Sequence, residues 1–388
     1  MGEPRIGPGQ IRQAQVYAAG MAGRRAAVPF RADELEARAR DVMSPEPFGY
    51  LASAGMEATA RANRDALDAV RLVPRMARDV GRRELGIELF GRSLPAPLLL
   101  APIGVQDLAH PEADLSTARA AASRGVPMIF SNQASVPMEA CVAAMGDAPR
   151  WFQLYWTRSD DLCESLVRRA EACGCDAIVI TLDTTMLGWR PVDLGHGFLP
   201  FLSGRGIAQY TSDPVFRAML ERPPEEDMLA AAALFTRIYS DPTVDWERLR
   251  KIRGWIKLPV VLKGVQHPVD AALAAEEGWD GIVVSNHGGR QVDGAVGSAA
   301  QLAACAAAVD GRCKVLFDSG VRGGADVLKA LALGADAVLL GRPWVWGLAV
   351  DGEAGVGAVI DDVIGELDLT LGLIGCDDVR KLGRDCLA

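Results

Sequence analysis

Residues 259–290 read PVVLKGVQHPVDAALAAEEGWDGIVVSNHGGR. An apolar run, PVVLK (Pro259–Lys263), is followed by an alanine-rich segment, Pro268–Glu277, and then by a second apolar run, GIVVS (Gly281–Ser285). Short runs rich in Val, Ile and Leu favour strands that are covered on both faces, and a helix-length segment between two of them is typical of a parallel pair. The stretch therefore predicts one strand–helix–strand unit of a parallel sheet.

The same alternation recurs along most of the chain. Further apolar runs are PLLLAP (Pro97–Pro102), PMIF (Pro127–Phe130), WFQL (Trp151–Leu154), AIVITL (Ala177–Leu182), KVLFD (Lys314–Asp318) and AVLLG (Ala337–Gly341), and Asp114–Arg124, Asp160–Ala172 and Gly324–Leu333 have helical spacing. Taken alone, each run could also be a piece of a buried helix. Eight runs alternating with helices favour the α/β class and a (β/α)8 TIM barrel, because eight parallel strands close such a barrel.

One interval between the runs is far longer than the rest. It contains residues 189–245, which we expect to form a lid inserted after the fourth strand, at the carboxyl face where barrel enzymes have their active sites. The predicted organisation is a single domain, 1–388. Residues 1–95 form N-terminal helices and a small hairpin that close the barrel's bottom, with a mobile tail over 1–10; the barrel occupies 96–350, and terminal helices, including Val356–Leu373, occupy 351–388.

Composition excludes several classes of protein. The chain of 388 residues has 41 Lys and Arg against 50 Asp and Glu, a net charge of −9. An acidic chain of this kind argues against nucleic acid or an anionic membrane surface as the main partner. No apolar run has the roughly 18 residues of a membrane span, and the N-terminus lacks a signal layout. Eight cysteines without a CxxC pair fit a reducing cytoplasm.

The densest polar cluster follows the sixth predicted strand, at Ser285–Gln291 (SNHGGRQ). His287 can take up a proton near neutral pH, and Arg290 can hold a carboxylate with two hydrogen bonds. The alternative is a surface loop in which both side chains are solvated. His287 is nevertheless the one histidine of the four that lies at a strand end beside a cation.

Two charged side chains end neighbouring strands. Asp183 could orient and stabilise a protonated imidazole, although an aspartate in this place is equally well a helix cap. Arg190 follows it by seven residues. Lys263 ends the fifth strand, where burial of an ammonium group is costly unless it meets an anion. We therefore expect a bound negative group there; burial of Lys263 without such a partner is the weaker alternative.

Two loops resemble a phosphate cradle. Asp318–Gly324 (DSGVRGG) follows the seventh strand, and Gly341 and Arg342 follow the eighth, the usual place of phosphate sites in barrels. Plain turns with glycine caps are the alternative. No GxGxxG motif follows an early strand, so a nicotinamide dinucleotide is not indicated, and no HExxH motif, paired cysteines or carboxylate cluster indicates a metal.

Other candidates carry weaker signals. Gln153 and Tyr155 alternate at the end of the third strand and share a face. Composition alone places Tyr50 in the core. His110 and His267 stand before prolines as helix-start residues, and His196 lies in the lid.

Ser285–Asp293 (SNHGGRQVD) resembles the active-site signature of the FMN-dependent L-2-hydroxy acid oxidising family, which includes glycolate oxidase, lactate oxidase and mandelate dehydrogenase. The resemblance runs from about Phe48 to Cys376 and includes APIG (Ala101–Gly104), WFQLY (Trp151–Tyr155), TLD (Thr181–Asp183), VLKGV (Val261–Val265), FDSGVRGG (Phe317–Gly324) and LLGRP (Leu339–Pro343). Within the family, GWRPVDL (Gly188–Leu194) and YTSDPVF (Tyr210–Phe216) are most similar to the lactate 2-monooxygenase branch.

The resemblance implies a role for each matching residue. It makes His287 the base, with Asp183 as its partner, Arg290 and Arg190 as carboxylate ligands, Tyr50 and Tyr155 as contacts of the carboxylate or hydroxyl, and Lys263 as the cation beside the flavin. Ring and ribityl contacts of FMN would come from Pro102, Ile103, Gly104, Ser131, Gln153, Thr181 and Ser285, and its phosphate would lie on Asp318, Gly320, Arg322, Gly341 and Arg342.

Four departures from the family pattern bear on the pocket. The Tyr50 segment is one residue shorter than in the monooxygenases, and Gln133 stands where many relatives have an aromatic residue. Ser319 replaces a glycine of the phosphate loop, which a small residue can tolerate. Gly104 stands where oxidases often have alanine, and we expect the smaller residue to leave room beside the flavin.

The resemblance implies oxidation of an L-2-hydroxy acid to the 2-oxo acid with oxygen as acceptor, in a cytoplasmic homo-oligomer (tetramer or octamer). A product held under the lid could be decarboxylated by peroxide, the monooxygenase outcome. Alternatives are a dehydrogenase with a quinone or protein acceptor, an oxidase of a larger aromatic or biosynthetic hydroxy acid, a non-redox flavin isomerase and a silent flavin-binding scaffold. Phe198, Phe201 and Tyr210 of the lid suggest an apolar wall.

Overall fold

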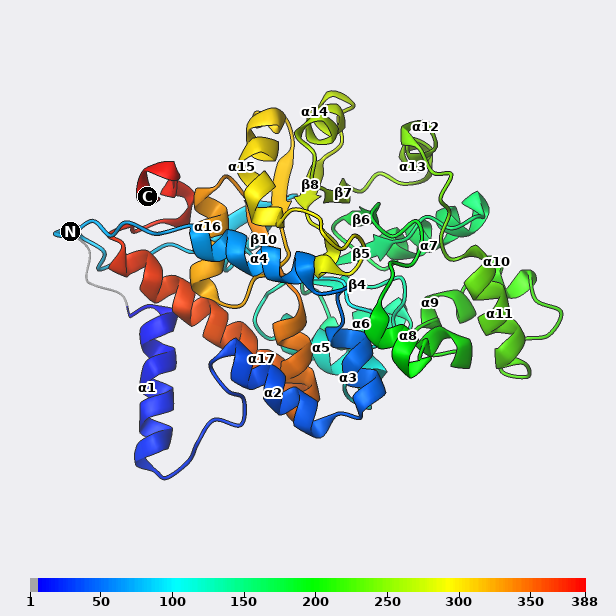
Figure 1. The fold of residues 1–388 in the computed structure, drawn as a ribbon, viewed down its shortest axis with the longest axis horizontal. Coiled ribbons are helices and arrows are strands. Elements are labelled where there is room, and N and C mark those ends of the chain that lie inside the picture. Colours follow the sequence, from blue (N-terminus) through cyan, green and yellow to red (C-terminus); the bar gives the residue numbers. More distant parts are fainter. Residues whose placement is uncertain (1–5) are drawn as a thin grey trace.

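The computed structural model describes residues 6–388. Eight parallel strands close into a barrel in the order β10-β3-β4-β5-β6-β7-β8-β9, with helices around it (Figure 1). The strands are β3 (Leu98–Leu100), β4 (Met128–Phe130), β5 (Arg150–Leu154), β6 (Ile178–Thr181), β7 (Val260–Val265), β8 (Gly281–Val284), β9 (Lys314–Phe317) and β10 (Ala337–Leu340). The predicted TIM barrel is confirmed, with each of the eight apolar runs forming a strand.

Helices lie in the connections between successive strands, as a (β/α)8 barrel requires. These connections contain α5 (Ala113–Ala122), α6 (Met138–Met145), α7 (Asp160–Ala172), α14 (Pro268–Glu276), α15 (Ser298–Val309) and α16 (Gly324–Ala332). Nearly all strand residues are buried, because side chains pack inward into the barrel and outward against these helices. The last element, α17 (Arg342–Leu373), consists of two helical parts on either side of a kink at Asp351 and Gly352, whose φ and ψ are not helical. Its second part therefore begins close to residue 351, where we expected the terminal helices to start.

We predicted that the N-terminal region closes the bottom of the barrel, but most of it lies elsewhere. Only the hairpin β1 (Ile87–Leu89) and β2 (Arg92–Leu94) closes the bottom, with Leu89 and Leu94 packed into the barrel's inner cluster. The other N-terminal elements are α1 (Pro8–Met21), α2 (Ala32–Val42), α3 (Pro45–Ala52) and α4 (Ala58–Ala69). α1 and α2 pack along α17, whereas α4 packs on α15 and on the turn after β8.

The predicted mobile tail, residues 1–10, is wrong over its last residues. Helix α1 begins at Pro8, where proline favours a first helical turn, and Gly9 donates to the buried Asp368 carboxylate. Residues 1–5 lie outside the described part of the chain. Among residues 6–388, every helix is too short or too polar to cross a membrane.

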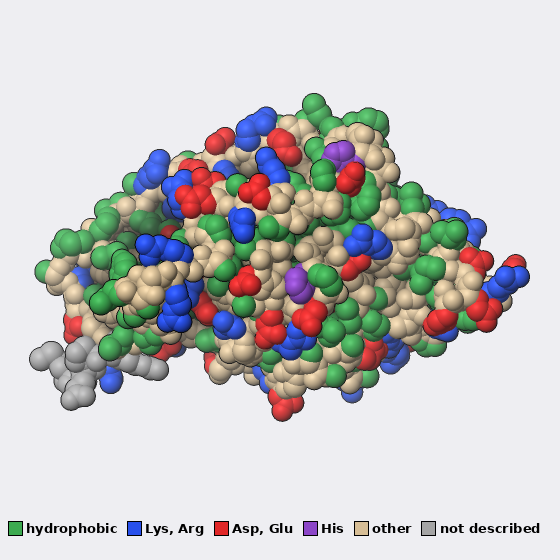
Figure 2. All heavy atoms as spheres, turned by 90° about the horizontal axis from the view of Figure 1, so that it is seen from below, with side chains coloured by type: hydrophobic (Ala, Val, Ile, Leu, Met, Phe, Trp, Pro, Cys, Tyr) green, Lys and Arg blue, Asp and Glu red, His purple; other side chains and the backbone are tan. Residues whose placement is uncertain are grey.

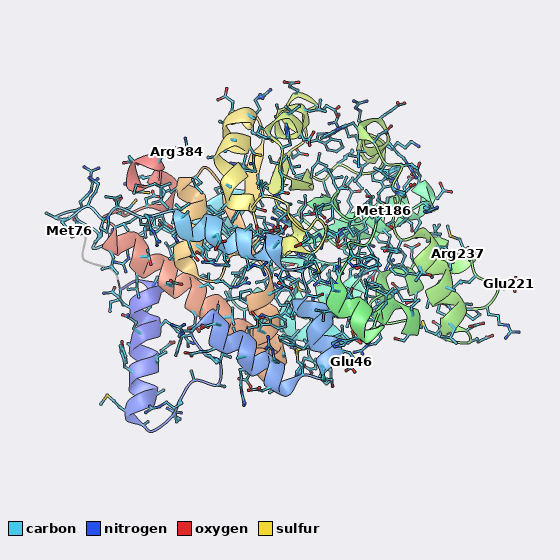
Figure 3. The ribbon with its side chains drawn as sticks, in the orientation of Figure 1. Glu46, Met76, Met186, Glu221, Arg237 and Arg384 are labelled. Carbon is cyan, nitrogen blue, oxygen red and sulfur yellow. The ribbon has the colours of Figure 1, made fainter. Side chains whose placement is uncertain are left out.

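The long interval between β6 and β7 contains α8 (Pro191–His196), α9 (Ala208–Thr211), α10 (Pro214–Ala218), α11 (Met228–Ile238), α12 (Trp246–Leu249) and α13 (Ile252–Trp255). Its buried side chains are continuous with the hydrophobic cluster around the barrel strands: Tyr210, Phe216 and Phe235 are fully buried there, with the Tyr210 ring edge-on to both phenylalanines. Its outer edge, with Glu221 and Arg237, points away from the barrel (Figure 3). Leu187, Arg190 and Phe201, from the segment around α8 and the turn η2 (Pro200–Ser203), line the main pocket at the carboxyl face. Other parts of the interval contact neighbouring strand-end loops, as Arg205 does with Asp107.

Charges on the surface are mixed. The face in Figure 2 has Lys and Arg interspersed with Asp and Glu over most of its area, with some local blue groups. The face that Figure 2 shows is therefore not the broad basic surface that a nucleic-acid partner favours.

Candidate active site

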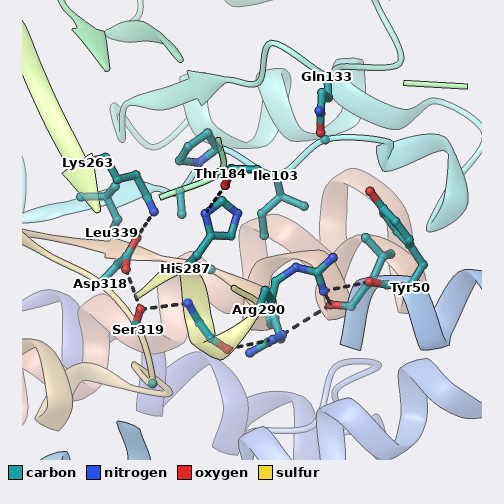
Figure 4. A pocket seen from close by; sticks show the side chains of 18 of the residues that line it. Tyr50, Ile103, Gln133, Thr184, Lys263, His287, Arg290, Asp318, Ser319 and Leu339 are labelled. Atoms are coloured by element: carbon teal, nitrogen blue, oxygen red, sulfur yellow. Dashed lines mark hydrogen bonds and ion pairs between the residues drawn. The ribbon is translucent and has the colours of Figure 1, made fainter. Parts of the chain in front are cut away.

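One pocket opens at the carboxyl ends of the barrel strands (Figure 4). It encloses about 1010 Å³, including space open to solvent. The carboxyl ends of all eight strands line it together with α3 and the lid. The lining residues used below are Tyr50, Pro102, Ile103, Gly104, Gln133, Tyr155, Thr184, Leu187, Arg190, Phe201, Lys263, His287, Arg290, Asp318, Gly320, Arg322, Gly341 and Arg342. Side chains from sequence-distant segments thus share a single space.

His287 lines this pocket and pairs with Asp183, which lies behind it and lines a neighbouring pocket. The Nδ1 atom of His287 lies 2.7 Å from Oδ1 of Asp183, and Thr184 Oγ1 lies 3.3 Å from the same nitrogen. A proton on Nδ1 that is donated to the carboxylate leaves Nε2 with a free lone pair. Gly264 permits the approach: its φ is 105°, and a Cβ there would lie 2.8 Å from Asp183 Cβ.

Electrostatics keep this pair in the state that a base requires. Burial lowers the pKa of His287, and the nearby Lys263 and Arg290 lower it further, outweighing the opposite effect of Asp183. Burial would raise the pKa of Asp183, but the charges of His287 and Lys263 lower it overall. The imidazole is therefore neutral and the carboxylate ionised at neutral pH.

Two arginines converge beside the imidazole. Arg290 donates from Nη1 to the backbone oxygens of Tyr50 (2.8 Å) and Ser53 (2.7 Å), and its guanidinium lies 5.4 Å from the Tyr50 ring centre. Arg190 donates from Nε to the backbone oxygen of Arg290 at 3.1 Å. Within residues 6–388, no carboxylate forms an ion pair with Arg290, whose pKa falls to about 9 because it is buried and close to Arg190. An anion such as a substrate carboxylate would relieve this repulsion.

Lys263 is buried at the inner end of the pocket. Its Nζ lies 3.1 Å from Asp318 Oδ2 and donates to Ser285 Oγ at 2.9 Å. Burial would lower the pKa of the ammonium group, but the charges of Asp318 and Asp183 raise it overall. The site thus holds a permanent positive charge beneath the pocket floor.

The residues expected to hold a flavin ring surround this cation. Pro102, Ile103 and Gly104 line the pocket, while Gln153 and Thr181 lie buried among the strand ends. Within the described residues, Gln153 Nε2 and Thr181 Oγ1 are buried polar atoms without a hydrogen-bond partner. Such atoms normally have partners, so a ring with polar edges fits them.

The far end of the pocket suits a phosphate. Gly320 adopts a φ of 88°, and a Cβ built on Gly341 would meet nothing within 4 Å, which leaves the backbone open to a close ligand. Burial, and after it the positive charge of Arg322, lowers the pKa of Arg342 to about 10. Burial also lowers the pKa of Arg322. Arg342 donates to the backbone oxygen of Gly288 at 3.1 Å. Two buried guanidinium groups and an open backbone fit a dianion.

Several expectations about the pocket need correction. The position of a Cβ on Gly104 is occupied by the backbone oxygen of Gln133, 2.6 Å away, so the glycine leaves no spare room on that side. Tyr210 is fully buried and donates to Asn132, and Phe198 packs edge-on against Tyr50, so of the three lid aromatics only Phe201 lines the pocket. His196 lies outside it, against Gly49.

Tyr50 lies at the pocket wall rather than in a remote core, although it is only 6% exposed. Sequence reasoning treated Ser319 only as a tolerated replacement for a glycine, and it missed Asn63. Ser319, at φ 83°, accepts hydrogen bonds at Oγ from the backbone of Asn286 and Gly288, and donates to Asp318. Asn63 in α4 contacts the His287 loop through Asn286; its segment had no recognisable pattern, whereas Asn286 directly precedes His287.

Fold and site together define a barrel enzyme with a general base, an anion-binding pair of arginines and a phosphate-binding flavin site. Residues 39–388 match the family model described as FMN-dependent dehydrogenase, and the chain belongs to this family. Its cofactor is FMN, and the family's reaction is oxidation of α-hydroxy acids.

Named relatives are similar over nearly their whole length. The chain is 41% identical to an L-lactate oxidase of Lysinibacillus sphaericus (strain C3-41), over 90% of each chain. It is 43% identical to the 4-hydroxymandelate oxidase of Amycolatopsis orientalis, covering 90% of this chain and 96% of that one. A solved structure of mandelate oxidase with (S)-4-hydroxymandelic acid matches with a TM-score of 0.81 and 42% identity, over 92% of this chain and 99% of that one.

Proposed function

We propose that this protein oxidises an L-2-hydroxy acid to the 2-oxo acid and passes the electrons to oxygen. The observation that carries the proposal is the pocket in which His287, paired with Asp183 behind it, lies together with Arg190 and Arg290 beside the residues that would hold a flavin. Relatives named as oxidases of lactate and 4-hydroxymandelate support oxygen as the acceptor.

Each side chain has a definite task in this reaction. Arg290 and Arg190 bind the carboxylate, and His287 Nε2 takes the proton from the α-carbon. Asp183 stabilises the imidazolium that results. Burial raises the pKa of Tyr155, so its hydroxyl stays protonated and can donate to the substrate. FMN, when bound, would supply the acceptor for the two electrons, and Lys263 would favour the extra negative charge on its ring.

We place the substrate's side chain against Leu187 and Phe201, with the Gln133 amide nearby, since all three line the pocket. An apolar group therefore fits this end. We also propose that lid residues 189–245 retain the product after oxidation, because Arg190 and Phe201 belong to them. Retention would allow peroxide to decarboxylate the 2-oxo acid, which makes the monooxygenase outcome the second candidate. A homo-oligomer, tetramer or octamer, is the assembly that we propose.

The test mixes the FMN-loaded enzyme with L-lactate, L-mandelate and L-4-hydroxymandelate, first without oxygen and then in air. We expect loss of the visible flavin absorbance, followed by oxygen uptake. Pyruvate with peroxide identifies an oxidase, and acetate with carbon dioxide identifies the decarboxylating outcome. Flavin reduction without oxygen uptake would instead indicate a quinone or protein acceptor.

His287→Ala separates binding from chemistry. The variant should retain FMN, since no cofactor-facing group is removed, and its flavin reduction should be slower by about 10²–10⁴-fold. The measurement is stopped-flow absorbance under anaerobic conditions. A normal rate in this variant would refute the role of His287.

A further inference from the structure

A buried asparagine of the N-terminal region contacts the loop that carries the base. Asn63 lies in α4, is 1% exposed, and faces Asn286, which is 6% exposed. The two amides exchange hydrogen bonds: Asn63 Nδ2 donates to Asn286 Oδ1 at 2.8 Å, and Asn286 Nδ2 donates to Asn63 Oδ1 at 2.7 Å. A reciprocal pair of this kind holds both side chains in one orientation.

Backbone groups fix which end of each amide points where. The Ser298 N–H donates to Asn63 Oδ1 at 2.9 Å, and the Gly289 N–H donates to Asn286 Oδ1 at 3.1 Å, so both positions must be oxygens. Asn286 Nδ2 also donates to the backbone oxygen of Val296 at 3.0 Å. The pair therefore ties together the start and the end of the loop 286–298.

Asn286 in turn holds the turn in which His287 sits. It caps the short helix η3 (His287–Gly289), where His287 has a φ of 58°. A histidine in the left-handed region is strained and persists only when its surroundings hold it. The same conformation aims Nδ1 at Asp183.

The rest of α4 follows this loop closely. A Cβ on Gly289 would lie 2.8 Å from the Ala60 nitrogen, and one on Gly297 would overlap the Ala62 oxygen. Asp293 Oδ1 accepts from the Ala58 N–H at 3.0 Å. Contact over the whole helix makes α4 the support of the loop, and Asn63 is its buried polar contact.

The next residue on α4 serves the other loop of the pocket. Arg64 Nη1 donates to the Gly320 oxygen at 2.5 Å and pairs with Asp326 at 2.6 Å, while Asp326 accepts from the Arg322 N–H at 2.8 Å. Asn63 also lies against the phosphate loop, since a Cβ on Gly320 would meet the Asn63 Cβ and backbone oxygen at 3.0 Å. Alanine keeps these atoms, so truncation of Asn63 removes only the amide that reaches the base loop, whereas truncation of Arg64 removes the side chain that reaches the phosphate loop. Arg64 supplies a natural contrast to Asn63.

We propose that Asn63 is a positioning residue for the base: through Asn286 it fixes the strained turn that aims His287 at Asp183. The inference rests on the proposed role of His287 and adds a residue that never touches substrate or cofactor. Arg64 does the corresponding work for the phosphate loop.

The experiment compares FMN-loaded Asn63→Ala, Asn63→Asp, Arg64→Met and Leu67→Ala. Leu67 is buried on the same helix, so its truncation destabilises α4 without removing a contact to the base loop. Each variant is measured by thermal unfolding, FMN content and the anaerobic rate of flavin reduction as a function of substrate concentration. Crystal structures of the two Asn63 variants report the His287–Asp183 contact directly.

We expect Asn63→Ala to retain FMN and to lose about 10–100-fold in the limiting rate of reduction, since a misplacement of about 1 Å costs this much, with a smaller change in substrate affinity. Asn63→Asp keeps the two contacts in which Oδ1 accepts, but its second carboxylate oxygen cannot donate and would face Asn286 Oδ1. Its rate should therefore be no higher than that of Asn63→Ala. Arg64→Met should lose FMN affinity instead, and Leu67→Ala should lose stability alone.

The proposal is overturned if Asn63→Ala keeps the His287–Asp183 contact in its crystal structure, or if its rate falls no further than that of Leu67→Ala. If the wild-type enzyme reduces none of the hydroxy acids offered, the proposed function fails, but the crystal structures still decide whether Asn63 positions His287. The two failures are therefore distinguishable.

Discussion

The two ends of the pocket are built in different ways. At the phosphate end, Gly320, Arg322, Gly341 and Arg342 all follow β9 or β10 by a few residues. At the substrate end, His287 and Arg290 follow β8, but Tyr50 comes from α3 and Arg190 from the start of the lid. One end is a direct product of the barrel, and the other is assembled by packing between distant segments.

This difference separates the two ends in function as well. Loops that follow adjacent parallel strands lie side by side whatever the rest of the chain does. The substrate end depends on α3 and the lid keeping their places, which they do through contacts such as Ser53 Oγ to Asp193 Oδ1 at 2.8 Å. We therefore expect changes at the substrate end to alter catalysis while FMN stays bound.

The largest expected effect is that of Asp183→Asn. The amide cannot stabilise an imidazolium and would offer an N–H to the wrong tautomer, so flavin reduction should slow by about 10²–10⁴-fold. Stopped-flow reduction by substrate measures it, with FMN content as the control. A rate within a few-fold of the wild type would show that Asp183 is only a structural cap.

The pH dependence of the same reaction gives a second test. Because the pKa of His287 is lowered by burial and by Lys263, the neutral base should persist below pH 6.5, and the rate should fall only at more acidic pH. Asp183 raises that pKa, so its replacement by asparagine should move the acid limb to still lower pH. A limb that moves to higher pH would contradict this assignment.

Arg290→Met and Arg342→Met form a matched pair, one at each end. Removal of a buried charged partner of a bound anion costs about 2–5 kcal/mol. Arg290→Met should lose that much in substrate affinity and retain FMN, whereas Arg342→Met should lose it in FMN affinity. Titrations of substrate and of FMN measure the two effects. Loss of FMN in Arg290→Met would show that the substrate end and the phosphate end do not act independently.

The sequence predicts the phosphate end better for a physical reason. Strand periodicity locates all eight strands, and with them Lys263, Asp318 and Arg342. Tyr50 and Asn63 belong to helices with no barrel period, so composition alone puts Tyr50 in the core, and Asn63 is not found at all. Resemblance to the family recovers Tyr50. Neither approach shows that the Gln133 backbone fills the space beside Gly104, because that contact depends on how two loops pack.

Gly104→Ala tests the packing of the loop after β3 against the loop after β4. The new methyl group would meet the Gln133 oxygen at 2.6 Å and the Gln133 Cβ at 2.9 Å, so the 131–135 loop must shift. Overpacking of this kind costs about 1–3 kcal/mol. Thermal and urea unfolding of the FMN-loaded enzyme measure the loss. Unchanged stability would mean that the loop yields freely.

Ser53→Ala should have the smallest effect. It removes the hydrogen bond to Asp193, whose carboxylate also lies 3.7 Å from Arg190, and so it loosens α3 against α8. A loss of about 1 kcal/mol at the substrate end predicts a roughly fivefold rise in KM with FMN affinity unchanged. Ser44→Ala, at the exposed start of the same helix where the hydroxyl makes no capping bond, is the control. Equal effects of both variants would show that α3 responds as a whole; a rise in KM confined to Ser53→Ala would show that the lid contact itself places the arginine.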